Sequence, residues 1–206
     1  HNGGEDGSPA DNTITYLVES LDAENMVLDI EAGSGVWWRF RLTKEAVETS
    51  PVDGTWVITP EAGSLGVGPT QGDISWWSID AAGVDQRSCY FDDTYVFSGG
   101  SFSNVLGSET WLEGWQGVDA DGCGAPIAPH DGSNPATFVY DEAAGTLTVS
   151  GSGAYIGLPK AHNGGEDGMP VNDTTTYLVN LIDANTMIID IEAGSGVWWT
   201  YSLTKI

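Results

Sequence analysis

The feature of the sequence that most constrains its fold is a long internal repeat. Residues 162–205 repeat residues 1–44 without a gap, at a fixed offset of 161, and about two-thirds of the paired positions are identical. Most of the differences are conservative, such as Val27 against Ile188. A fixed long period is typical of tandem modules that each build their own core. The chain is therefore expected to contain parts of two copies of one module.

The repeat also predicts where the modules begin and end. Only the last third of a module is present twice, so residues 1–44 are expected to be the C-terminal third of a preceding module. Residues 45–54 (EAVETSPVDG) have the acidic, Pro- and Gly-containing composition of a linker. Residues 55–206 would then form one complete module. Alternatively, the strands of residues 1–44 complete a neighbouring chain by strand addition or swapping.

Short apolar runs separated by turns predict an all-β module. The candidate strands are residues 55–59, 94–97, 136–140, 146–150, 175–181, 187–191 and 196–203. No segment shows a sustained helical period. Many short strands with frequent turns are typical of an antiparallel β-barrel or β-sandwich. A long insertion with two tryptophans, residues 64–88, interrupts this pattern.

The charge of the chain excludes some partners. Thirty acidic residues against six basic ones give a net charge of −24. Nucleic acid and anionic membrane surfaces attract basic patches, so neither is an expected partner. The charge favours neutral or cationic partners, divalent cations in particular. No apolar run in the sequence is long enough for direct insertion into a membrane.

The two cysteines, Cys89 and Cys123, are expected to form a disulfide. An even number of cysteines favours a disulfide in a chain of secreted character, and we expect a secreted or extracellular, cell-surface-associated protein. Zinc binding is the weaker alternative, because only two thiols and three scattered histidines are present.

The nine tryptophans include the main candidates for ligand contact. Trp76 and Trp77 are adjacent, and because neighbouring side chains of a strand point to opposite faces, one of the two is expected to face outward. A second segment combines aromatic and polar side chains: Trp111, Glu113, Trp115 and Gln116. Aromatic faces beside polar groups suit sugar rings, because the face packs on C–H groups while polar groups bind hydroxyls. The alternative is that these tryptophans fill the core, as expected for Trp56.

Loops contribute further candidates. His130 and Asp131 lie in a Pro- and Gly-rich loop, where functional residues concentrate, but Asp131 could also bond its own backbone in a turn. Lys160 is one of only six basic residues, so we expect it to make a specific ion pair or ligand contact. Asp119 and Asp121 alternate like the start of a calcium loop, although the later ligands of an EF-hand are missing. Ca²⁺ is the one cofactor that the sequence suggests.

Several motifs follow one another in a characteristic order. They are Gly54-Thr55-Trp56, Cys89, Asp92-Asp93, Tyr95-Val96-Phe97, Thr146-Leu147-Thr148 and the aromatic residues 197–203. This order resembles the lipocalin-like domains of secreted Bacteroidetes proteins. The stretches PEAGSLGVGP, ISWWS, CYFDDTYVF, TWLEGWQG and GAYIGLPKA further resemble modules of large secreted flavobacterial proteins. Some of those modules accompany family 16 glycoside hydrolases. The resemblance covers residues 55–206 and, through the repeat, 1–44; it implies a lipocalin-like strand order and extracellular work on glycans.

Catalysis is not expected. Retaining glycosidases need two carboxylates about 5 Å apart. The family 16 pattern places Glu, Asp and Glu on one face of a strand, but Val27 and Ile188 occupy the nucleophile position in the two copies. We also find no Ser/His/Asp set or phosphate loop in a supporting context.

Two functions remain, from different classes. The first is a non-catalytic carbohydrate-binding module of a tandem-repeat protein, with a β-glucan-like polysaccharide as its partner and with avidity from repetition. The alternative is a structural repeat of a giant adhesin or extracellular fibre, in which neighbouring identical modules or chains exchange strands.

Overall fold

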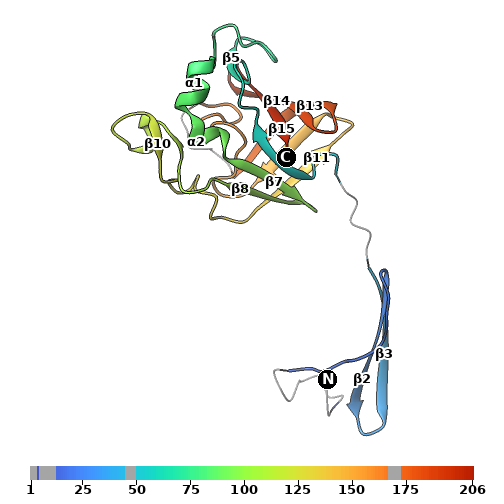
Figure 1. Cartoon of the computed structure of the whole chain (residues 1–206). Helices are drawn as coiled ribbons and strands as arrows, with labels where there is room; N and C mark the ends of the chain where they lie inside the picture. Colours follow the sequence, from blue (N-terminus) through green and yellow to red (C-terminus); the bar gives the residue numbers. More distant parts are fainter. Residues whose placement is uncertain (1–3, 5–12, 45–49, 167–172) are drawn as a thin grey trace. The chain divides into compact units, whose positions relative to one another are not determined.

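The computed structural model describes residues 4, 13–44, 50–166 and 173–206 (Figure 1). The chain divides into two compact units, His1–Glu48 and Thr49–Ile206, and each is described by itself. Part of the expected linker, residues 45–49, lies outside the described residues. The rest belongs to the second unit, since Val52 is fully buried there. In the described part of the chain, no helix combines the length and apolar character needed to cross a membrane.

The first unit is a three-stranded antiparallel sheet. Its strands, in spatial order, are β1 (Leu17–Leu21), β2 (Asn25–Gly33) and β3 (Val36–Thr43). Ile30 and Ala32 on β2 are buried, but β3 is exposed along its whole length. A sheet of alternating sequence normally buries one face, so this exposed strand is unusual.

The second unit is a closed antiparallel β-barrel of eight strands (Figure 1). The strands are β4 (Gly54–Ile58), β7 (Thr94–Ser98), β8 (Ser101–Val105), β11 (Ala136–Asp141), β12 (Thr146–Ser150), β13 (Thr174–Asp183), β14 (Thr186–Gly194) and β15 (Val197–Lys205). Each pairs with the next along the chain, and β15 pairs back with β4. The all-β prediction is confirmed, and of its two alternatives the barrel is correct. The Ile206 N–H donates to the Thr55 carbonyl at 2.9 Å, so the barrel ends beside the strand with which it begins.

The remaining elements lie outside the ring of eight strands. They are β5 (Leu65–Gly68), β6 (Trp77–Ser78), α1 (Ala81–Gln86), α2 (Ser88–Phe91), β9 (Thr110–Leu112), the 3₁₀ helix η1 (Gly114–Gln116) and β10 (Gly122–Gly124). β4 pairs with the end of β15, and β5 pairs with the beginning of β15. β4 and β5 together therefore act as one interrupted strand beside β15. The predicted disulfide is confirmed: Cys89 on α2 is bonded to Cys123 on β10.

The barrel interior is filled by side chains and by a buried segment, residues 154–158. The Tyr177 hydroxyl fixes this segment, because it accepts from the Ile156 N–H at 2.8 Å and donates to the Ile156 carbonyl at 3.1 Å. Around it lies a core that includes Trp56, Phe97, Leu147, Ile189 and Leu203. The interior is thus packed, as in small barrels whose side chains fill the lumen.

Two more tyrosines hold the same segment. The Tyr95 hydroxyl accepts from the Gly157 N–H at 3.1 Å, and the Tyr201 hydroxyl accepts from the Leu158 N–H at 3.4 Å. Gly157 has a φ of +83°, and a Cβ there would lie 2.2 Å from the Tyr201 ring. Only glycine fits this close approach, because both its φ and its lack of a side chain are needed.

Candidate functional site

Trp76 and Trp77 are the only exposed aromatic residues among the described residues of the second unit, at 57% and 40% exposure. Both are exposed, where strand alternation predicts one. The reason is that β6 contains only two residues and pairs only with β5, so Trp76 lies before the strand and Trp77 lies on an edge. The structure therefore exposes both tryptophans of this segment at the surface of the second unit.

Trp77 is held by its neighbours. Its ring packs edge-on against Trp199, with 6.2 Å between the centroids, and the Arg87 guanidinium lies 5.5 Å from the Trp77 centroid. Arg87 also lies 4.4 Å from the centroid of Trp111, and Lys160 lies 5.1 Å from that of Trp199. A guanidinium over an aromatic face is attracted to the ring, so these contacts help to hold Trp77 in place.

Trp111 is only 6% exposed, so its ring does not form a surface for a ligand. It is buried in the core, and Arg87 lies over its ring. For this residue the core alternative is therefore correct, because the strand β9 turns its side chain inward. Arg87 thus contacts both the buried Trp111 and the exposed Trp77.

Glu113 connects the polar residues of the second predicted segment. Its carboxylate accepts from Lys160 Nζ and from Trp115 Nε1, each at 3.0 Å. The Gln116 Oε1 accepts from the Glu113 backbone N–H at 3.0 Å. The ion pair expected of Lys160 is thus present, and the side chains that were predicted to bind a ligand are bonded to one another.

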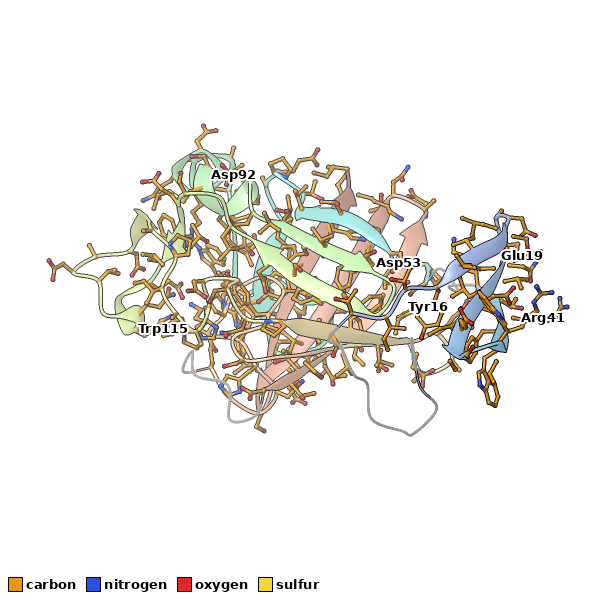
Figure 2. The ribbon with its side chains drawn as sticks, turned by 90° about the horizontal axis from the view of Figure 1, so that it is seen from below. Tyr16, Glu19, Arg41, Asp53, Asp92 and Trp115 are labelled. Atoms are coloured by element: carbon orange, nitrogen blue, oxygen red, sulfur yellow. A yellow bond between two sulfur atoms is a disulfide. The ribbon has the colours of Figure 1, made fainter. Side chains whose placement is uncertain are left out.

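A small cavity of about 140 Å³ lies beside this network, lined by Trp115, Gln116, Ile127, Ala128, Pro129 and His130. Trp115 lies in the lobe that carries β9 and β10 (Figure 2). His130 is buried, and its ring packs edge-on against Trp115 and Tyr155. Pockets for drug-sized ligands are about 300 Å³ or larger, so this cavity suits a single small ring.

Asp131 has a local structural role. Its Oδ1 accepts from the Ser133 N–H at 3.1 Å and from the Ser133 hydroxyl at 2.7 Å. These bonds lower the pKa of the Asp131 carboxyl below its usual value. The turn alternative is therefore correct for Asp131, and the ligand-binding prediction lacks support there.

The two predicted calcium ligands are Asp119 and Asp121. Asp121 Oδ1 accepts from the Gly114 N–H at 2.9 Å and so shapes the lobe around η1. Within residues 13–44, 50–166 and 173–206, no group of three or more His, Cys, Asp or Glu side chains could hold a metal ion. The calcium prediction for Asp119 and Asp121 therefore gains no support from a third side chain of these types in the described part of the chain.

Sequence reasoning missed a buried carboxyl group. Asp93 follows Asp92, labelled in Figure 2, at the end of α2, and its Oδ2 accepts from the Thr110 hydroxyl at 2.6 Å. Its Oδ1 is buried without a hydrogen-bond partner. Burial raises the pKa of Asp93 to about 8, and the negative charge of Asp92 adds to the shift. No local pattern distinguishes this aspartate from the exposed one before it.

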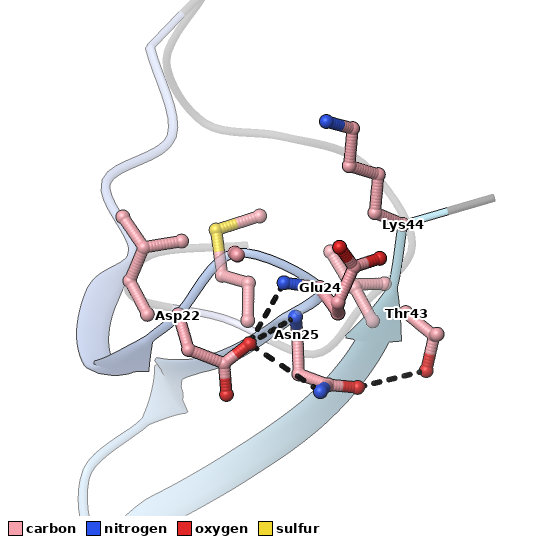
Figure 3. A pocket seen from close by; sticks show the side chains of 9 residues that line it. Asp22, Glu24, Asn25, Thr43 and Lys44 are labelled. Atoms are coloured by element: carbon pink, nitrogen blue, oxygen red, sulfur yellow. Dashed lines mark hydrogen bonds between the residues drawn. The ribbon is translucent and has the colours of Figure 1, made fainter. Parts of the chain in front are cut away.

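A cavity of about 310 Å³ in the first unit lies where β3 ends beside the β1–β2 turn (Figure 3). Asp22 Oδ1 closes that turn by accepting from the backbone N–H groups of Glu24 and Asn25. The cavity also contains the apolar residues Met26 and Leu42. Their counterparts in the repeat, Met187 and Leu203, are fully buried in the barrel core. Residues that are core positions in the barrel therefore line a cavity in the described part of the first unit.

Fold and site together define a closed antiparallel β-barrel with an exposed tryptophan pair beside the start of β15. Comparison with protein-family models and with curated proteins finds no match for this chain. The resemblance to secreted flavobacterial modules therefore stays a prediction.

Proposed function

We propose that this chain is a non-catalytic, extracellular carbohydrate-binding module for a neutral, β-glucan-like polysaccharide. The exposed pair Trp76 and Trp77 carries the proposal. Large aromatic side chains bury most of their surface in folded proteins, and adjacent exposed apolar residues mark binding sites. Trp77 is held in a fixed orientation, so little conformational entropy would be lost when a sugar ring stacks on it.

The electrostatics of the second unit favour a neutral ligand. Its basic residues are Arg87, Lys160 and Lys205, and each lies over a tryptophan ring. These cations are therefore engaged within the fold, while acidic residues dominate the rest of the sequence. A sulfated or uronic acid polymer would be repelled by such a surface, whereas a neutral glucan would not.

Two further observations support the proposal. The cavity beside Trp115 has the size for one ring and offers a second contact apart from the exposed pair. The disulfide suits an oxidising compartment outside the cytoplasm. Tandem repetition would raise the overall affinity, because the second binding event becomes intramolecular.

The proposal can be tested by electrophoresis in gels that contain laminarin, a neutral β-glucan, or a sulfated polysaccharide. We expect laminarin to retard the wild type and the sulfated polymer to leave its mobility unchanged. Trp76→Ala should abolish retardation without changing the unfolding temperature, because the side chain is mostly exposed. The matched control is Trp37→Ala, which removes an exposed tryptophan of the first unit and should leave retardation intact. If no neutral polysaccharide retards the wild type, the proposal fails.

A further inference from the structure

The sheet of the first unit has the same construction as the three strands that close the barrel. β2 and β3 pair in the register of β14 and β15: Asp29 faces Arg39, and Asp190 faces Thr200. The cross-strand bond is kept in both, because Asp29 accepts from Arg39 at 2.7 Å and Asp190 accepts from Thr200 at 2.6 Å. The main difference is in the first strand, where the irregularity follows Val18 in β1 and Leu181 in β13.

The two sheets differ in what covers their apolar face. In the barrel, the inward residues of β14 and β15 include Met187, Ile189, Trp199, Tyr201 and Leu203. The counterparts in the first unit are Met26, Leu28, Trp38, Phe40 and Leu42. Trp199 and Leu203 are 5% and 0% exposed, whereas Trp38 and Leu42 are 50% and 44% exposed. In the described part of the first unit, the sheet thus carries the apolar residues of a barrel wall, with several of them more exposed than their counterparts.

We propose that β1–β3 is a second closing sheet for the one barrel, able to take the place of β13–β15 against β12 and β4 of the same chain. The chain then contains one set of strands β4–β12 and two interchangeable sheets that can close it, one before and one after it in sequence. The inference rests on the repeat and on the exposed face, and it is independent of carbohydrate binding.

The chain connection allows this exchange at β4. In the barrel, Lys205 at the end of β15 lies opposite Trp56 on β4. Lys44 is the counterpart of Lys205, so in the exchanged arrangement it would lie beside Trp56. Nine residues separate Lys44 from Gly54 in the sequence, more than most hairpin loops use. Neighbouring strands are only about 5 Å apart, so the connection is an ordinary loop between antiparallel strands.

The side chains of the first sheet also suit the barrel interior. Tyr16 is the counterpart of Tyr177, whose hydroxyl holds the buried segment 154–158. Phe40 replaces Tyr201 and would lose only the 3.4 Å bond to Leu158. Arg39 would replace Thr200 on the half-buried outer face of β15 and would keep its bonds to Asp29, the counterpart of the buried Asp190.

A matched pair of substitutions in the full chain tests the proposal. Leu203→Asp places a carboxylate in the core and disables the C-terminal sheet, and Leu42→Asp does the same to the N-terminal sheet. Each single variant should keep the near-UV circular dichroism and cooperative unfolding of the wild type, and light scattering should show a monomer. The double variant should lose the barrel. If Leu203→Asp alone unfolds the barrel, or forms a dimer, or if the double variant stays folded, the proposal is wrong.

A disulfide can identify the exchanged pairing directly. Thr148 on β12 lies opposite Thr176, with 2.9 Å between the hydroxyls, and Thr15 is the counterpart of Thr176. In the Leu203→Asp background, Thr15→Cys with Thr148→Cys should form an intramolecular disulfide, detected by peptide mapping. The control combines Thr148→Cys with Thr13→Cys. Residue 13 lies two positions before residue 15 and would face the same side of the strand but out of register with Thr148, so this pair should not cross-link. A folded Leu203→Asp protein without the first cross-link would also overturn the proposal.

Discussion

The buried carboxyl group of Asp93 should make the barrel less stable as the pH rises. Its pKa is raised from 3.8 to about 8, so near neutral pH the folded protein holds a proton that the unfolded chain releases. Below about pH 4 both states are protonated, and the group leaves stability unchanged. Between about pH 4 and pH 8 the unfolded state binds fewer protons, so the free energy of unfolding falls as the pH rises. Since one pKa unit corresponds to about 1.4 kcal/mol, the full loss is on the order of 5 kcal/mol.

Asp93→Asn is the variant that isolates this effect. The amide keeps the shape and an acceptor for the Thr110 hydroxyl, but it does not ionise. Urea denaturation of both proteins at pH 5 and pH 8 gives the difference in unfolding free energy, which should shift by about 3 to 4 kcal/mol in favour of Asn at pH 8. The other acidic residues repel one another more at high pH in both proteins, so only the difference reports on Asp93. A constant difference across this range would refute the reasoning.

Two further predictions concern the scaffold. Gly157→Ala should lower the free energy of unfolding by about 3 kcal/mol or more in urea, because its φ is +83° and its Cβ would overlap the Tyr201 ring. Gly145→Ala is the control, because its φ is also positive but its Cβ would meet only the Val179 carbonyl, at 3.5 Å. This variant should lose only about 1 kcal/mol of unfolding free energy. An equal loss at both sites would contradict the overlap with the Tyr201 ring. Replacing both cysteines by Ala should lower the same free energy by about 4 kcal/mol, given their separation of 34 residues. An unchanged urea midpoint would show that the disulfide does not restrict the unfolded chain.

The strands of the barrel were largely predictable from local pattern. Met187, Ile189 and Ile191 alternate with outward residues, and the repeat marks the same alternation in Met26 and Leu28. The local pattern could not distinguish a barrel from a sandwich, because both folds bury one face of each strand. Closure depends on the pairing of β15 with β4, which brings together residues from opposite ends of the module.

The candidate site was predictable only in part. The adjacent Trp76 and Trp77 predicted one outward ring, whereas both are exposed, and the two cysteines predicted the disulfide. For Trp111 the sequence left ligand contact and core burial open, because local pattern does not show which face of β9 packs on the core. The burial of Asp93 has no sequence signal either, since carboxyl groups are usually exposed. Such contacts are fixed by the tertiary fold and not by the segment that carries them.

The place where the barrel begins and ends has a mechanical consequence. Gly54 starts β4 and Lys205 ends β15, and these strands are antiparallel neighbours with Ile206 bonded back to Thr55. Tension along the chain on either side of the barrel would therefore pull apart two adjacent strand ends. The interstrand hydrogen bonds, which lie perpendicular to the strands, would break one after another, as in a zipper, instead of resisting together in shear. A barrel pulled in this way would therefore open along the β4–β15 seam before its other strands separate.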